Sequence, residues 1–220
     1  MTSFQRFFSK VLASLMLAGL SFVFVSSVKG QCPTDIAPTS SIWIGPTTVT
    51  IPVPGTSCHI DIKYCYRTLP DGTDEYYIEE IDPKSSDCDN VTWAAIITAA
   101  REYFFQTEQG HSCDPSNPCS GPLITSVSVF TATCAKMHLT SCGTCSPTAV
   151  CIFCSGAYCA KTCGICHQSD GTNLECNCTF TTLGSGDCTT APDGWPNITV
   201  TYANSAGYYD HCYINGTCSN

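Results

Sequence analysis

The CGICH string at residues 163–167 is the most chemically specific pattern in this 220-residue chain. C-x-x-C-H is the attachment pattern of c-type haem, in which two cysteines form thioethers and the histidine supplies an axial ligand to the iron. The pattern therefore gives one hypothesis for a cofactor site. Its candidate haem-binding residues are Cys163, Cys166 and His167.

A second hypothesis uses the same cysteines as zinc ligands. Cys142 and Cys145 are followed, after seventeen residues, by Cys163 and Cys166. This matches the spacing of two C-x2-C pairs that hold a tetrahedral zinc ion through four thiolates. The candidate metal ligands are Cys142, Cys145, Cys163 and Cys166.

Disulfide formation competes with both cofactor hypotheses. Ten of the nineteen cysteines lie between residues 134 and 178, and such crowding produces C-x2-C matches by chance. An exported chain meets an oxidising compartment, where bridges are the usual fate of cysteine. We therefore favour disulfides and no cofactor, with zinc or haem c as alternatives. Nine bridges would leave one odd cysteine, available for an intermolecular disulfide. One expected bridge joins Cys113 to Cys119.

The N-terminus has the features of a signal peptide over residues 1–30. Arg6 and Lys10 precede an apolar run at residues 11–25, which is shorter than the ~20 residues that a membrane span requires. Cleavage before Gln31 would release a secreted, extracytoplasmic chain. No later segment has the length and apolarity of a stable membrane span.

The charge of the chain excludes one class of partner. The formal net charge is −9, and removal of Arg6, Lys10 and Lys29 with the leader would leave six basic against eighteen acidic residues, or −12. Nucleic acid and anionic membranes need clustered lysine and arginine, so we expect neither as a partner. Solubility is the simplest reason for the acidity.

Residues 31–133 are predicted to form a β-rich domain. Strands are expected at residues 47–53, 58–67 and 75–81, and strict alternation at 58–67 places Cys58, Ile60, Ile62, Tyr64 and Tyr66 on the buried face. The sequence Leu-Pro-Asp-Gly at residues 69–72 predicts the turn of a hairpin.

One helix is expected, at about residues 90–106. Asp89 or Asn90 would be its N-cap. Its apolar residues recur at helical spacing and should pack on the hairpin. They are Trp93, Ile96, Ile97, Ala100 and Phe104.

The remaining sequence divides into a cysteine-rich segment or subdomain at residues 134–178 and a C-terminal β segment at 179–220, which should pack back on the first domain. The cysteine-rich segment has few large aliphatic residues, so bridges or a metal should order it. The predicted class is α+β, mostly β. It consists of a small antiparallel sheet, one main amphipathic helix and a disulfide-dense, irregular segment.

The sequence CHIDIKYCYR at residues 58–67, the returning strand with its Tyr-Tyr-Ile, and the following helix together resemble uncharacterised secreted cysteine-rich proteins of Bacteroidota-type bacteria. The resemblance covers residues 47–105 and does not extend to the cysteine-rich segment. It implies a bacterial, extracytoplasmic setting, and the family has no activity to carry over.

The sequence contains no H-E-x-x-H, G-x-S-x-G or P-loop motif. Aromatic groups at Tyr76-Tyr77, 103–105 and Tyr208-Tyr209 could form a face for sugar or peptide, although such residues more often belong to the core of a small β domain. The sequence therefore favours an exported, disulfide-stabilised, non-enzymatic protein with a structural, adhesive or binding role. The alternative is a metal- or haem-binding module centred on residues 142–167.

Overall fold

A computed structural model describes most of residues 31–220. The described residues are 32–34, 36, 40–108, 112–113, 116, 118–119, 125–140, 148–154, 156–185, 195–200, 213–214 and 218. The strands are β1 (Ile44–Pro52), β2 (His59–Thr68), β3 (Asp74–Pro83), β4 (Thr125–Ala132), β5 (Cys134–Thr140), β6 (Thr148–Phe153), β7 (Ala157–His167), β8 (Asn173–Gly184) and β9 (Tyr213–Ile214). The helices are η1 (Ser86–Cys88) and α2 (Trp93–Thr107). The mostly β class with one main helix is confirmed.

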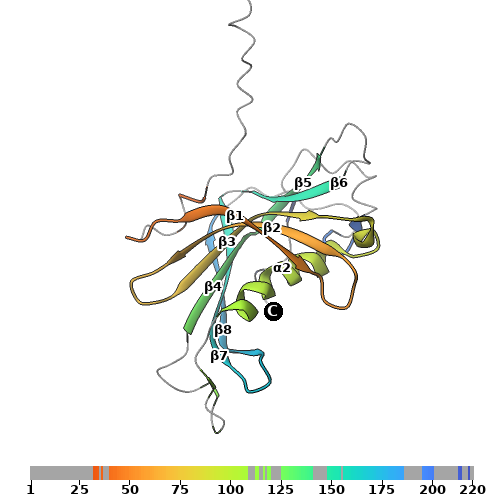
Figure 1. Ribbon diagram of the computed structural model, residues 1–220. Coiled ribbons are helices and arrows are strands. Elements are labelled where there is room, and N and C mark those ends of the chain that lie inside the picture. The colour runs from red at the N-terminus through yellow and green to blue at the C-terminus, as the bar shows by residue number, and fades with distance from the viewer. Residues whose placement is uncertain are drawn as a thin grey trace, which may run out of the picture. The chain divides into compact units, whose positions relative to one another are not determined.

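The strands form a nine-stranded sheet that divides at β3 (Figure 1). One edge of β3 pairs with β2, which pairs with β1. The other edge is shared, because residues 74–77 pair with β4 and residues 80–81 pair with β6. From there, one branch continues through β4, β7 and β8, and the other through β6, β5 and β9.

The sheet is mixed rather than purely antiparallel. β3 and β4 run parallel, whereas the other strand pairs are antiparallel. A parallel pair needs a long crossover between its strands, and α2 supplies it. The helix lies against one face of the sheet, in contact with β3, β4 and β8 (Figure 1).

The predicted hairpin of β2 and β3 is confirmed, together with its turn. Leu69 donates its N–H to the Thr73 carbonyl at 2.8 Å, and Gly72 donates to the Leu69 carbonyl at 3.0 Å. Gly72 has φ +86°, a conformation that glycine adopts without steric cost. The turn residues therefore predicted the position of this hairpin correctly.

Alternation along β2 holds, but burial does not follow it throughout. Ile60 and Ile62 are fully buried, as expected, whereas Cys65 and Arg67 on the opposite face are buried too. Cys65 is bridged to Cys32, and the Arg67 guanidinium lies 4.3 Å from the Trp43 ring centroid. Residues preceding β1 therefore cover the second face, an arrangement that period-two alternation cannot reveal.

The apolar stripe of α2 forms the centre of the core. Every predicted stripe residue is buried, and the Phe104 ring stacks on Tyr76 of β3 with centroids 4.5 Å apart. The expected N-cap is wrong, because Thr92 takes this position and its hydroxyl accepts from the Ala95 N–H at 3.3 Å. Asp89 instead ends η1, which is held by the Cys58–Cys88 bridge.

The C-terminal segment contributes to the start of α2. Trp93 donates its N–H to the Ile198 carbonyl at 3.0 Å, and Val200 donates to the Val91 carbonyl at 3.0 Å. The Trp93 and Trp195 rings lie 6.1 Å apart, and Ile198 and Val200 are buried. These contacts hold residues 195–200 against the N-terminus of α2.

The described residues of the cysteine-rich segment are organised in strands rather than irregularly. Residues 134–178 contribute β5, β6, β7 and the first half of β8 to the sheet. Small residues and cysteines are buried along these strands, including Ala149, Ala160 and Cys163. Backbone pairing with neighbouring strands therefore orders this segment, although it contains few large aliphatic residues.

Candidate functional site

The CGICH string forms the end of β7, where its cysteines enter two different bridges. Cys163 is bonded to Cys178 on β8, and Cys166 is bonded to Cys113. Residues three apart in a strand point to opposite faces, so the two sulfurs diverge. The His167 ring nitrogen Nδ1 lies 3.0 Å from Oδ1 of Asn173. Thioether or thiolate chemistry at Cys163 and Cys166 would require both bridges to be absent.

Of the four zinc candidates, Cys142 and Cys145 lie outside the described residues. Cys163 instead lies beside a carboxylate, because Oε2 of Glu175 is 3.5 Å from both Cys163 Sγ and Cys178 Sγ. These three side chains place their potential ligand atoms within 4.8 Å of one another. In the bridged state the sulfurs are not thiolates, and Lys161 Nζ already contacts Glu175 at 2.6 Å.

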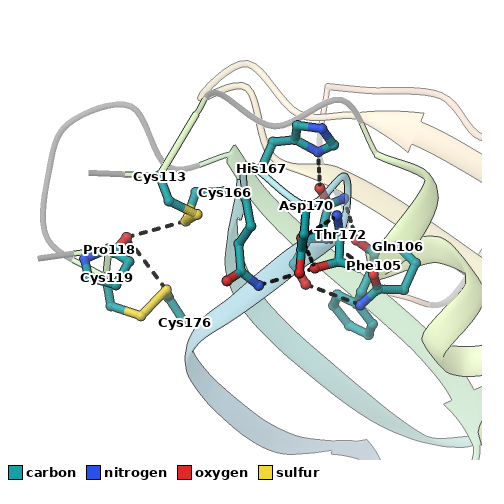
Figure 2. Close-up of a disulfide and its surroundings, with 12 residues drawn as sticks. Phe105, Gln106, Cys113, Pro118, Cys119, Cys166, His167, Asp170, Thr172 and Cys176 are labelled. Carbon is teal, nitrogen blue, oxygen red and sulfur yellow. Dashed lines mark hydrogen bonds between the residues drawn. A yellow bond between two sulfur atoms is a disulfide. The ribbon is translucent and has the colours of Figure 1, made fainter. Parts of the chain in front are cut away.

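The expected bridge between Cys113 and Cys119 is wrong. Cys119 is bonded to Cys176 on β8, and Cys113 to Cys166 on β7 (Figure 2). The Pro118 carbonyl oxygen lies between these bridges, 3.3 Å from Cys166 Sγ and 3.8 Å from Cys176 Sγ. Two bridges therefore hold Cys113 and Cys119 against the sheet. Proximity along the chain did not determine which sulfurs meet.

The free thiol among the described cysteines belongs to Cys151 on β6. It is fully buried, and burial, with a further contribution from the charge of Glu80, raises the pKa of this thiol. A neutral, inaccessible thiol is a poor nucleophile. An intermolecular disulfide through Cys151 would require β6 to leave the sheet.

The described residues form a groove of about 630 Å³ between α2 and the end of β1. Its β side consists of residues 50–54, which include Pro52 and Pro54. Its helical side is made of small residues near the start of α2 and of longer side chains farther along. The helical residues are Ala94, Ala95, Thr98, Ala99, Glu102, Tyr103 and Gln106.

The groove is lined mainly by apolar groups and contains one charged residue, Glu102. Oε1 of Glu102 lies 2.8 Å from Nζ of Lys161 on β7. The same ammonium lies 2.6 Å from Glu175 on β8 and 4.6 Å from the centroid of the Phe105 ring. A helix and two strands therefore meet in one ionic cluster at the inner side of the groove.

The two carboxyl groups of this cluster have different proton affinities. Burial raises the pKa of Glu175, and the hydrogen bond that it shares with Glu102 raises the pKa further. Burial opposes ionisation of Glu102 as well. However, the hydrogen bonds from Glu175 and Lys161, with the charges of Lys161 and Arg101, lower its pKa overall. Glu102 therefore ionises more readily than Glu175.

Sequence patterns did not identify Glu102, Lys161 or Glu175. They lie on three elements that are distant in the chain, and the sheet topology brings them together. A partial signal exists for the groove, because Ala95 and Thr98 are small residues on the exposed face of a helix. Tyr103, from an aromatic group considered for binding, does line the groove, whereas its neighbour Phe104 belongs to the core.

Comparisons with known proteins give no assignment for this site. No protein-family model, no curated protein and no solved structure matches the chain.

Proposed function

We propose that this chain is an exported, non-enzymatic binding protein that holds a small organic ligand in the groove between α2 and β1. The N-terminal sequence has the features of a signal peptide, and six disulfides join described residues. Disulfides on this scale are typical of oxidising compartments. Among the described residues no helix has the length and apolarity to cross a bilayer.

The groove itself carries this proposal. Its volume of about 630 Å³ falls within the range of small-molecule sites, which are mostly apolar and contain few polar groups. Exposed faces of surface helices usually present charged or long polar residues. Here the short side chains of Ala94, Ala95 and Thr98 project little from the helix and make its surface mainly apolar. Such a surface favours binding over solvation.

Both sides of the groove are anchored to the core. On the helical side, α2 is anchored by its buried stripe. On the β side, Val53 is buried and donates its N–H to the Cys58 carbonyl at 2.8 Å. A preformed site loses little conformational entropy when a ligand binds. The resemblance over residues 47–105 spans nearly all of the groove and supports a bacterial, extracytoplasmic setting for its ligand.

Fluorescence titration with a neutral apolar probe tests the proposal. The probe is a dansylamide with a six-carbon chain that ends in a hydroxyl group, and we expect saturable binding with blue-shifted emission. Thr98→Trp should fill the groove and weaken binding at least tenfold. Thr107→Trp is the matched control, because Thr107 is an exposed threonine of the same helix that does not line the groove.

The control variant should bind the probe as the wild type does. Equal affinity of the Thr98→Trp variant and the wild type would overturn the assignment of the groove. Absence of saturable binding to the folded wild type would overturn the binding function as a whole.

A further inference from the structure

We propose that the ligand of the groove is an organic cation, whose apolar body lies along α2 and whose ammonium group contacts Glu102. This inference deepens the proposed function and rests on it. Three features support it, namely the position of Glu102 in the groove, the side from which its counterion Lys161 approaches, and the presence of Tyr103 in the same groove.

The groove has a polar end. Among its described lining residues Glu102 alone carries charge, and its side chain is 40% exposed. Its neighbour Tyr103 also lines the groove and is partly exposed. A carboxylate and an aromatic ring that line the same groove can both attract an ammonium ion, the first by its charge and the second by the ring quadrupole.

The counterions of Glu102 lie outside the groove. Lys161 is 12% exposed and lies over the Phe105 ring, which is buried between α2 and the sheet. Neither Lys161 nor Arg101 lines the groove. The positive charges therefore approach Glu102 from the protein side, and the cluster presents its negative end to the groove.

Acceptor capacity remains on Glu102. A carboxylate has about four lone-pair positions on its two oxygens. One oxygen of Glu102 accepts a hydrogen bond from Lys161 at 2.8 Å. Glu102 also shares a hydrogen bond with Glu175. Acceptor positions are left for a donor that enters from the groove. The formal charge of −9 on the whole chain favours a cationic over an anionic ligand as well.

A matched pair of probes tests this inference. The first is the hydroxyl-terminated dansylamide used above, and the second differs only by an ammonium group in place of the hydroxyl. Titrations at 150 mM salt limit attraction to distant surface charges. We expect the ammonium probe to bind at least tenfold more tightly to the wild type, and Glu102→Gln to reduce this ratio to less than threefold.

Two further variants control for the net charge and for the neighbouring ions. Asp87→Asn removes one negative charge at an exposed carboxylate outside the groove, and should leave the preference for ammonium unchanged. Lys161→Met removes the counterion that faces Glu102 from the sheet, and should increase the preference. If Glu102→Gln fails to fold, Lys161→Met still tests the inference, because an unchanged or smaller preference there would contradict it.

Failure of the inference is distinguishable from failure of the proposed function. Equal binding of the two probes to the wild type would overturn the cationic ligand while leaving the groove as a binding site. A preference for ammonium that persists in Glu102→Gln would also overturn it, because attraction would then come from elsewhere on the chain. If neither probe binds the folded wild type, both proposals are wrong.

Discussion

Arg67 illustrates how one buried residue depends on the residues around it. Its side chain was expected on the outer face of β2, but it is 4% exposed and its Nε lies 2.6 Å from Oε2 of Glu75. The Trp43 ring covers the guanidinium. A buried ion pair of this kind is tolerated only while both charges are present. Removal of one leaves the other unpaired in a poorly solvated position.

We therefore expect Glu75→Gln to lower the free energy of unfolding by about 3 kcal/mol. The reason is the loss of the only carboxylate that Arg67 contacts among the described residues. Chemical denaturation monitored by tryptophan fluorescence would measure the change. Lys84→Met removes the more exposed pair with Asp61, at 2.8 Å, and should cost less than 1 kcal/mol. Similar losses in both variants would contradict the assignment.

Glu108 predicts a pH dependence of stability at the end of α2. Burial, with the charge of Asp74, raises the pKa of Glu108 from its ordinary value of 4.5 to about 7. The native state therefore binds more protons than the unfolded chain between these values, and stability should fall as the pH rises through about 7. After allowance for partial exposure, the loss should be about 1–2 kcal/mol.

Glu108→Gln should remove this decline, because a neutral amide does not titrate. Thermal melts between pH 5 and pH 8.5 would show it as a flatter profile than that of the wild type. Asp87→Asn, at an exposed carboxylate, serves as the control and should keep the slope. A slope that survives Glu108→Gln would assign the pH dependence to another group.

At the scale of elements, the sequence predicted the turn and the main helix correctly but did not predict which strands pair beyond the hairpin. The turn at residues 69–72 and the helical stripe both depend on neighbouring residues, and both were predicted correctly. The parallel pairing of β3 with β4 depends on residues about fifty positions apart, as does the meeting of Glu102 with Lys161 and Glu175. No periodicity records such contacts. The order strand, helix, strand was the available clue to a parallel pair, although an antiparallel sheet was expected.

The start of α2 provides a test at this scale. Thr92→Ala removes the hydroxyl that accepts from the Ala95 N–H and should lower the free energy of unfolding by about 1 kcal/mol. Asn90→Ala changes the residue that the sequence suggested as the cap, and should have an effect below 0.5 kcal/mol. Urea denaturation of both variants would compare them directly. A larger loss from Asn90→Ala would place the cap two residues earlier.

At the scale of the whole molecule, the bridges join segments that the sheet brings together. The six described disulfides close loops with sequence separations from 15 to 59 residues. Their effect on stability is expected to grow slowly with loop length, because a longer loop loses more freedom in the unfolded chain. The number of cysteines predicted this kind of stabilisation, whereas the partners depended on the register of β7 and β8.

Removal of single bridges tests that dependence. Replacing Cys119 and Cys176 with alanine opens a separation of 57 residues and should cost about 4 kcal/mol. Replacing Cys163 and Cys178 opens a separation of 15 residues and should cost about 3 kcal/mol. Guanidinium denaturation would measure both losses.

Cys151→Ala keeps all the described bridges and should be the mildest of the three changes. Peptide mapping without reduction would check the connectivity first. A peptide pair that links Cys113 to Cys119 would show that the assigned bridges are wrong, and the order of stabilities would then lose its basis.

The division of one β3 edge between β4 and β6 has a consequence for any shortened form of this protein. A fragment that ends before β6 would leave the backbone groups at Glu80 and Ile81 without the partners that they have in the intact sheet. Open strand edges of this kind recruit strands from other chains. Trimming the molecule to its N-terminal half would therefore create an adhesive surface, and fragments of that half should self-associate more strongly than the full chain.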